Sequence, residues 1–217
     1  MEKNNTLVSA FSWLFIGLLV CFGVSWITTF NEDLALTIFG AFGGYGYFVY
    51  LIAELVVAFV LILRIYKLNP LTAKILYLLY TALTGLSLTG IFVVYTTASL
   101  TFVFLAAALI FGAFALLGKT TKVDLSKWST YVLMALIGII ILELINLFLL
   151  NNSLSIALCI VSILVFTFFI AFDIQKALDK SYMANCENKG IYCAFQLFLD
   201  FINIFLDLLR LFGKSRD

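Results

Sequence analysis

Residues 153–176 read SLSIALCIVSILVFTFFIAFDIQK, and this stretch decides the fold. It contains no charged residue before Asp173, and a helix needs about 20 consecutive apolar residues to cross a bilayer. The apolar residues are continuous rather than alternating, which favours a helix over a strand of a membrane barrel. Because lipid offers the backbone no hydrogen-bond partners, the stretch predicts a transmembrane helix.

Six further stretches of the 217-residue chain have the same character, at residues 7–30, 46–66, 71–95, 99–118, 128–150 and 190–212. Hydrophobic residues make up 64% of the chain and charged residues 12%, whereas soluble domains typically have about 45–50% and about 25%. We therefore predict an all-α polytopic membrane protein, a bundle of seven transmembrane helices forming a single integral membrane domain over residues 1–217. Residues 31–45 contain several glycines, and we expect them to be part loop and part extension of the second stretch.

The polar composition argues against several classes of function. The net charge of +1 gives no basic surface of the kind that nucleic acid requires. The chain has no histidine, which removes the commonest general base and the usual zinc and serine-nucleophile systems. The four cysteines lack CxxC spacing, and we interpret them as structural thiols. We expect neither an enzyme, nor a cofactor, nor a nucleic-acid partner.

The basic residues alternate between loops. The second, fourth and sixth loops each hold three lysines or arginines, whereas the first, third and fifth hold none. The positive-inside rule then predicts that the even loops and the N-terminus are cytoplasmic and that the C-terminus is outside. Arg210, Lys214 and Arg216 near the C-terminus favour the opposite side, so a re-entrant last segment is the alternative.

Ionisable residues within the predicted spans are candidates for function, because a charge at the bilayer centre costs about 2.5–3.5 kcal/mol. They are the acids Glu54, Glu143, Asp173, Asp200 and Asp207, with Arg64 and Arg210 near span ends. In the last span a polar stripe, Gln196, Asp200, Asn203, Asp207 and Arg210, follows a spacing of four, three, four and three residues on one helix face. The stripe could line a water path, or form a static hydrogen-bonded seam between helices. Asp207 and Arg210 could also form a local ion pair.

Asp173 and Asp200 are equally far in sequence from the midpoint of the sixth loop, so we expect them at similar depth in adjacent antiparallel helices. Two carboxylates in contact at low dielectric cannot both ionise cheaply, and such a pair would titrate in two separate steps. This predicts a pH sensor. The alternative is that Asp173 only forms a salt bridge with Lys176 or Lys180 at the membrane surface.

Three other charged residues are candidates for the same polar path. Arg64 ends the second span at the cytoplasmic face, where it could reach the aspartates or simply obey the positive-inside rule. Glu54 lies about 15 Å deeper along that helix. Glu143 shares a face of the fifth span with Asn146, and the two could extend the path or form a packing seam.

Several segments resemble the Bax inhibitor-1 family, also called the transmembrane Bax inhibitor motif family. Two of these segments are FLDFINIFLDLLRLFG at 198–213 and AFDIQK at 171–176. Two others, LTGLSLT at 83–89 and TTKVDL at 120–125, are similar to the bacterial branch of the family. The resemblance implies a seven-helix bundle with the last helix central, in a bacterial cytoplasmic membrane. It also implies a pH-sensitive calcium leak, with Asp173 and Asp200 as the sensor and Arg64 as a latch. The C-terminus is short and differs from the extended charged tail of eukaryotic members, so we do not expect a cell-death role to carry over.

Together these features predict a calcium channel that opens in acid. In its closed state the ionised Asp173 and Asp200 hold Arg64. Glu54, Asn203, Asp207 and Glu143 are expected along the ion pathway, with calcium bound only transiently at Asp173 and Asp200. The expected partners are the lipid bilayer, calcium ions and protons. The alternatives are a proton-coupled cation exchanger and a non-transporting modulator of another membrane protein, such as a membrane protease.

Overall fold

The computed structural model describes residues 2–216, and the side chains of residues 6–216. Within this part of the chain, seven helices are long and apolar enough to cross a membrane. They span Thr6–Thr29, Gly46–Lys67, Pro70–Val94, Thr97–Thr120, Ser126–Leu149, Asn152–Leu178 and Lys189–Phe212. Each begins and ends within a few residues of the predicted stretch. The all-α fold with seven potential membrane spans is therefore confirmed.

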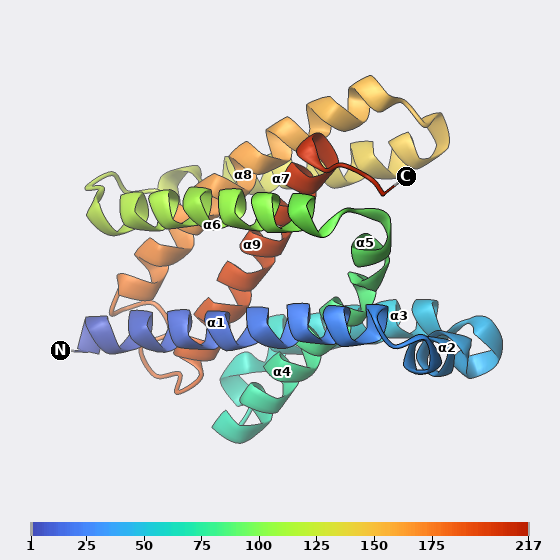
Figure 1. Cartoon of the computed structure of the whole chain (residues 1–217). Coiled ribbons are helices and arrows are strands. Elements are labelled where there is room, and N and C mark those ends of the chain that lie inside the picture. Colours follow the sequence, from blue (N-terminus) through green and yellow to red (C-terminus); the bar gives the residue numbers. More distant parts are fainter. Residues whose placement is uncertain (1, 217) are drawn as a thin grey trace. The chain divides into compact units, whose positions relative to one another are not determined.

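The helices in chain order are α1 to α9 (Figure 1). The seven spans correspond to α1 (Glu2–Thr29), α3 (Gly46–Arg64), α4 (Pro70–Ser87) continued by α5 (Thr89–Val94), α6 (Thr97–Thr120), α7 (Ser126–Leu149), α8 (Asn152–Leu178) and α9 (Lys189–Phe212). α9 is the most buried of the seven, as expected for a last helix at the centre of the bundle.

Residues 31–45 differ from the expected loop and extension. They form a separate helix, α2 (Glu32–Gly40), which ends in a 3-10 turn over Ala41–Gly44. The Asn31 side chain caps α2 by accepting a hydrogen bond from the Leu34 amide at 3.0 Å, and two acidic residues occupy the first turn. Gly43 and Gly44 have φ angles of 70° and 89°, which turns the chain before α3 begins.

The chain divides into two compact units. The first contains α1 to α5 and residues Lys180–Phe198, and the second contains Thr97–Asp179 and Leu199–Lys214. α9 therefore contributes its first turns to one unit and its remaining turns to the other. The single integral domain expected over residues 1–217 stays a prediction.

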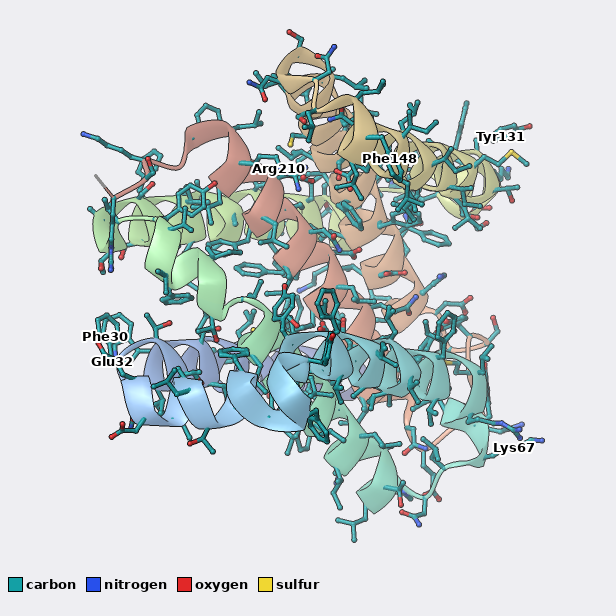
Figure 2. All side chains as sticks on the ribbon, turned by 90° about the vertical axis from the view of Figure 1, so that its right-hand side faces the viewer. Phe30, Glu32, Lys67, Tyr131, Phe148 and Arg210 are labelled. Atoms are coloured by element: carbon teal, nitrogen blue, oxygen red, sulfur yellow. The ribbon has the colours of Figure 1, made fainter. Side chains whose placement is uncertain are left out.

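In the first unit α1 packs closely on α4. The hydroxyl of Ser25 donates to the Gly85 carbonyl, and the Tyr77 hydroxyl donates to the Trp13 carbonyl at 2.9 Å. A Cβ at Gly85 would overlap the backbone of Cys21, so glycine is needed for this approach. Figure 2 shows Glu32 and Lys67 at opposite ends of this unit.

In the second unit α8 packs against both α6 and α7. Gln175 on α8 ties down the loop between α6 and α7, because its amide donates to the Val123 carbonyl at 2.7 Å and accepts from the Leu125 amide at 3.1 Å. α7 and α8 are joined by a two-residue turn in which Leu150 is left-handed, with φ 50°. Asn146 fastens that turn by donating to Ser155 at 2.7 Å and accepting from the Asn151 amide at 3.0 Å.

Candidate functional site

Asp173 and Asp200 come together in the second unit. Asp173 lies in the last two turns of α8 and Asp200 near the middle of α9. Their exposed fractions are only 4% and 5%, and the two carboxyl groups are close enough to interact electrostatically. We call these two residues the aspartate pair. Two acids so deeply buried and so close together are expensive to ionise at the same time.

Lys176 is the cation beside the aspartate pair. Its Nζ lies 3.3 Å from Oδ1 of Asp173, one helical turn away on α8, and 4.1 Å from the centre of the Phe172 ring. Lys176 also attracts the Asp200 carboxylate. The sequence presented a salt bridge with Lys176 as an alternative to the aspartate pair, but in the structure Asp173 takes part in both.

Asp200 has an unusual buried oxygen. Its Oδ2 is shielded from solvent and has no hydrogen-bond partner within the described residues. An unsatisfied buried acceptor typically costs about 1–3 kcal/mol, and more if it is charged. A proton, a water molecule or a passing cation at this oxygen would remove that cost. Among the described residues of the second unit, Oδ2 of Asp200 is thus a buried side-chain oxygen with unused accepting capacity.

The other polar residues of the last helix differ in their surroundings. Asn203 donates to the Leu199 carbonyl of its own helix at 2.7 Å, so this bond is not part of a seam between helices. Asp207 is buried and faces Ser162 and Cys159 on α8. Gln196 lies in the first unit, where its Oε1 is buried without a hydrogen-bond partner among the described residues.

Arg210 pairs with Glu143 and not with Asp207. Its Nη1 is 3.0 Å from Oε1 of Glu143 on α7 and 3.6 Å from the Cys159 sulfur. A local ion pair with Asp207 is therefore wrong, although the two residues still attract each other. The sequence spacing favoured the neighbour three residues away because it carries no information about which face of α7 meets α9.

Glu54 lies in the first unit, and both of its carboxylate oxygens accept hydrogen bonds from α4. The Thr84 hydroxyl donates to Oε1 and the Ser87 hydroxyl donates to Oε2, each at 2.7 Å. Sequence reasoning missed these two partners. Their signal was present, since two hydroxyl residues three positions apart lie on the same face of a helix. The LTGLSLT segment thus supplies the donors for an acid within a membrane span.

Arg64 is exposed at the C-terminal end of α3, in the first unit. Its latching of the aspartate pair stays a prediction.

Within the described residues, no group of three or more cysteine, aspartate or glutamate side chains is placed to hold a metal ion. Calcium prefers about six to eight oxygen ligands, so two carboxylates suit brief occupancy better than storage.

The chain is similar to a known protein family and to several bacterial proteins. Residues 3–217 match a family model described as "Inhibitor of apoptosis-promoting Bax1". An uncharacterized protein of Borreliella burgdorferi is 33% identical over 220 residues, which cover 99% of this chain and 94% of that protein. RP147 of Rickettsia prowazekii is 43% identical over 150 residues, and the inner membrane protein YbhL of Escherichia coli is 44% identical over 147. These matches cover 67% and 65% of this chain, and the chain covers 64% and 63% of those two proteins.

Proposed function

Since this chain is a membrane protein of the Bax inhibitor-1 family, we propose that it is a pH-sensitive calcium leak channel. The observation that carries the proposal is the aspartate pair: two buried acids, one of which has an oxygen without a partner, with Lys176 beside them. Two buried carboxyl groups that are expensive to ionise together are suited to sensing acid, and a buried carboxylate attracts a divalent cation.

The gating follows from charge. At neutral pH the aspartate pair retains negative charge and holds cations by charge-assisted hydrogen bonds. Lys176 is one such cation, and the Arg64 guanidinium is the proposed second one, acting as the latch that closes the cytoplasmic half of the path. Protonation removes negative charge, weakens the hold on Arg64 and opens the path, so flux rises as the pH falls.

The proposed ion pathway uses the other acids in the spans. Glu54, Asn203, Asp207 and Glu143 supply oxygen ligands along it, and Asp173 and Asp200 bind calcium transiently. Calcium is the transported substrate, and no resident cofactor is needed for this function. Few carboxylates supplemented by water allow an ion to enter and to leave, which conduction requires.

The proposed location is a bacterial cytoplasmic membrane with the N-terminus inside and the C-terminus outside. The relative YbhL is itself named an inner membrane protein. A backbone contact supports the placement of the C-terminus: the Arg216 amide donates to the Val94 carbonyl at 2.8 Å, and Ser215 pairs with Tyr95. Val94 and Tyr95 border the third loop, which has no basic residue and is predicted to be outside.

The test is calcium flux into proteoliposomes containing an internal dye, measured from about pH 6 to 8. Wild type should show flux that increases with acidity, and Asp200→Asn should flatten that pH profile. Asp33→Asn removes an exposed aspartate outside the spans and should behave as wild type.

Other outcomes identify the alternatives. Saturable calcium movement with an obligatory opposing proton flux would indicate a proton-coupled exchanger. No flux above empty liposomes, from protein shown to be folded, would favour a non-transporting modulator of another membrane protein. An unchanged pH profile in Asp200→Asn would refute the gating mechanism itself.

A further inference from the structure

The second unit contains a pocket where α7 ends, α8 begins and α9 ends. Its volume is about 380 Å³. The polar residues that line it are Glu143, Asn146, Asn152, Ser155 and Arg210. The rest of the lining is leucine and isoleucine. A pocket of this mixed character accepts a ligand with a charged part and an apolar part.

The position of the pocket along the helices corresponds to the edge of a bilayer. α7 ends at Leu149 and α8 begins at Asn152, so the turn between them borders the pocket. Glu143 lies about 10 Å below that turn, at 1.5 Å per residue. Arg210 is in the last turn of α9, near the C-terminal end of the helix (Figure 2). Arg210, at the end of its span, is at the level of the lipid headgroups, and Glu143 lies deeper in contact with it.

Arg210 and Glu143 leave hydrogen-bonding capacity for a ligand. The single contact between them joins Nη1 to Oε1. The Cys159 contact also uses Nη1, so within the described residues Nη2 and Nε of Arg210 and Oε2 of Glu143 have no hydrogen-bond partner. Both side chains are about half exposed, at 51% and 41%. Arg210 can therefore bind an anionic group, and Glu143 can bind a cationic group beside it.

Two further groups favour an anion beside Arg210. The Ser155 hydroxyl accepts from Asn146, which leaves its own proton to be donated. Asn152 is the first residue of α8, and the N-terminal end of a long helix carries partial positive charge. An anion in this pocket would meet a guanidinium, a hydroxyl and a helix terminus.

The surroundings of the pocket are apolar and exposed. Ile137, Ile140 and Ile141, which lie deeper along α7 than Glu143, have exposed fractions of 51%, 50% and 51%. In a chain that spans a membrane, such side chains contact acyl chains, so an occupant with acyl chains fits better than a free headgroup.

We propose that this pocket binds a phospholipid whose headgroup carries both a phosphate and a primary ammonium group, as phosphatidylethanolamine does. Arg210 and Ser155 hold the phosphate, and Glu143 accepts hydrogen bonds from the ammonium. The assignment goes beyond the proposed channel function, in which Glu143 supplies an oxygen ligand to the ion, because here the same side chain receives a lipid headgroup. It is tested by binding alone, so its failure and that of calcium flux are separate results.

The experiment is native mass spectrometry of the full chain in detergent. Phosphatidylethanolamine, phosphatidylglycerol and phosphatidylcholine with identical acyl chains are supplied at equal concentrations. Wild type should retain phosphatidylethanolamine about tenfold more tightly than phosphatidylglycerol, the effect of one charge-assisted hydrogen bond. Phosphatidylcholine has no ammonium proton to donate and should also bind more weakly.

Three variants resolve the contributions. Glu143→Gln should bind phosphatidylethanolamine and phosphatidylglycerol equally. Arg210→Gln should weaken the binding of all three lipids about tenfold. Lys214→Gln removes an exposed cation near the same end of α9 that does not line the pocket, and it should match wild type. If Arg210→Gln fails to fold, the selectivity of Glu143→Gln still decides the outcome.

Other results would overturn the proposal. Equal retention of the three lipids by wild type would show that the pocket does not select the headgroup. A loss of binding in Lys214→Gln as large as that in Arg210→Gln would show the same. Displacement of the lipid by an equal concentration of glycerophosphoethanolamine, which has the headgroup without acyl chains, would reassign the site to a soluble phosphate compound.

Discussion

Lys176 lies one helical turn beyond Asp173, and its Nζ is 3.3 Å from the Asp173 Oδ1. The same ammonium group sits over the Phe172 ring and attracts Asp200. The aspartate pair therefore has a cation on α8, the helix that carries Asp173, and this cation is present whatever the position of the proposed latch. A buried pair with a tethered counter-ion responds to protons differently from an isolated pair of acids.

Removing that counter-ion should change the pH at which calcium flux begins. Without the Lys176 charge the ionised aspartates lose stabilisation, so they bind protons at higher pH and the path opens in less acidic solution. We expect Lys176→Met to move the midpoint of the flux profile upward by roughly one pH unit, since a charged hydrogen bond is worth about 1.5–3 kcal/mol. Lys180→Met, which alters an exposed residue outside the spans, should leave the midpoint in place. A downward shift in Lys176→Met would contradict the proposed role.

The hydroxyl groups around Glu54 should contribute to stability. In Thr84→Val the Glu54 Oε1 loses its donor, and we expect the free energy of unfolding to fall by about 1–3 kcal/mol. Unfolding in mixed detergent micelles, followed by circular dichroism, measures this change. Thr101→Val alters an exposed threonine that donates only to its own helix and should have little effect. Equal losses in the two variants would mean that the contact with Glu54 is not stabilising.

The close approach of α1 and α4 depends on Gly85. Gly85→Ala would place a Cβ against the Cys21 backbone, so we expect a loss of about 1–3 kcal/mol in the free energy of unfolding. Gly112→Ala provides the matched control, because a Cβ there meets nothing within 4 Å. That substitution should be neutral or slightly stabilising, since alanine favours helix more than glycine does. The same unfolding assay compares both variants.

The predicted orientation can be tested with single cysteines. In a chain whose native cysteines are replaced by alanine, Ser215→Cys should react with a membrane-impermeant maleimide in intact cells, because the C-terminus is predicted to be outside. Lys122→Cys, in the fourth loop, should react only after the membrane is opened. Protection of residue 215 in intact cells would instead support a re-entrant last segment.

The spans could be predicted from the sequence because continuous apolar stretches leave little choice in lipid. Helix α2 was missed, although Asn31 followed by Glu32 and Asp33 is a readable start signal, because the nearby glycines favoured a loop. The position of Asp173 beside Asp200 followed from the antiparallel relation of neighbouring helices. The contacts of Arg210 with Glu143 and of Glu54 with Thr84 could not be predicted in this way. They depend on which face each helix turns toward its neighbour, and the sequence spacing does not determine that.

The fastened turn between α7 and α8 has a consequence for how the protein enters the membrane. Only two residues link these helices, so closing the hairpin costs little chain entropy. Within it Asn146 donates to the Asn151 carbonyl at 3.3 Å and to the Ser155 hydroxyl at 2.7 Å, and it accepts from the Asn151 amide at 3.0 Å. Because these polar groups are already hydrogen-bonded to each other, moving the turn from water toward the bilayer costs less free energy when α7 and α8 insert together than when either inserts alone. α7, which also carries Glu143, is best suited to insertion during synthesis as one half of a helical hairpin and not as a lone segment.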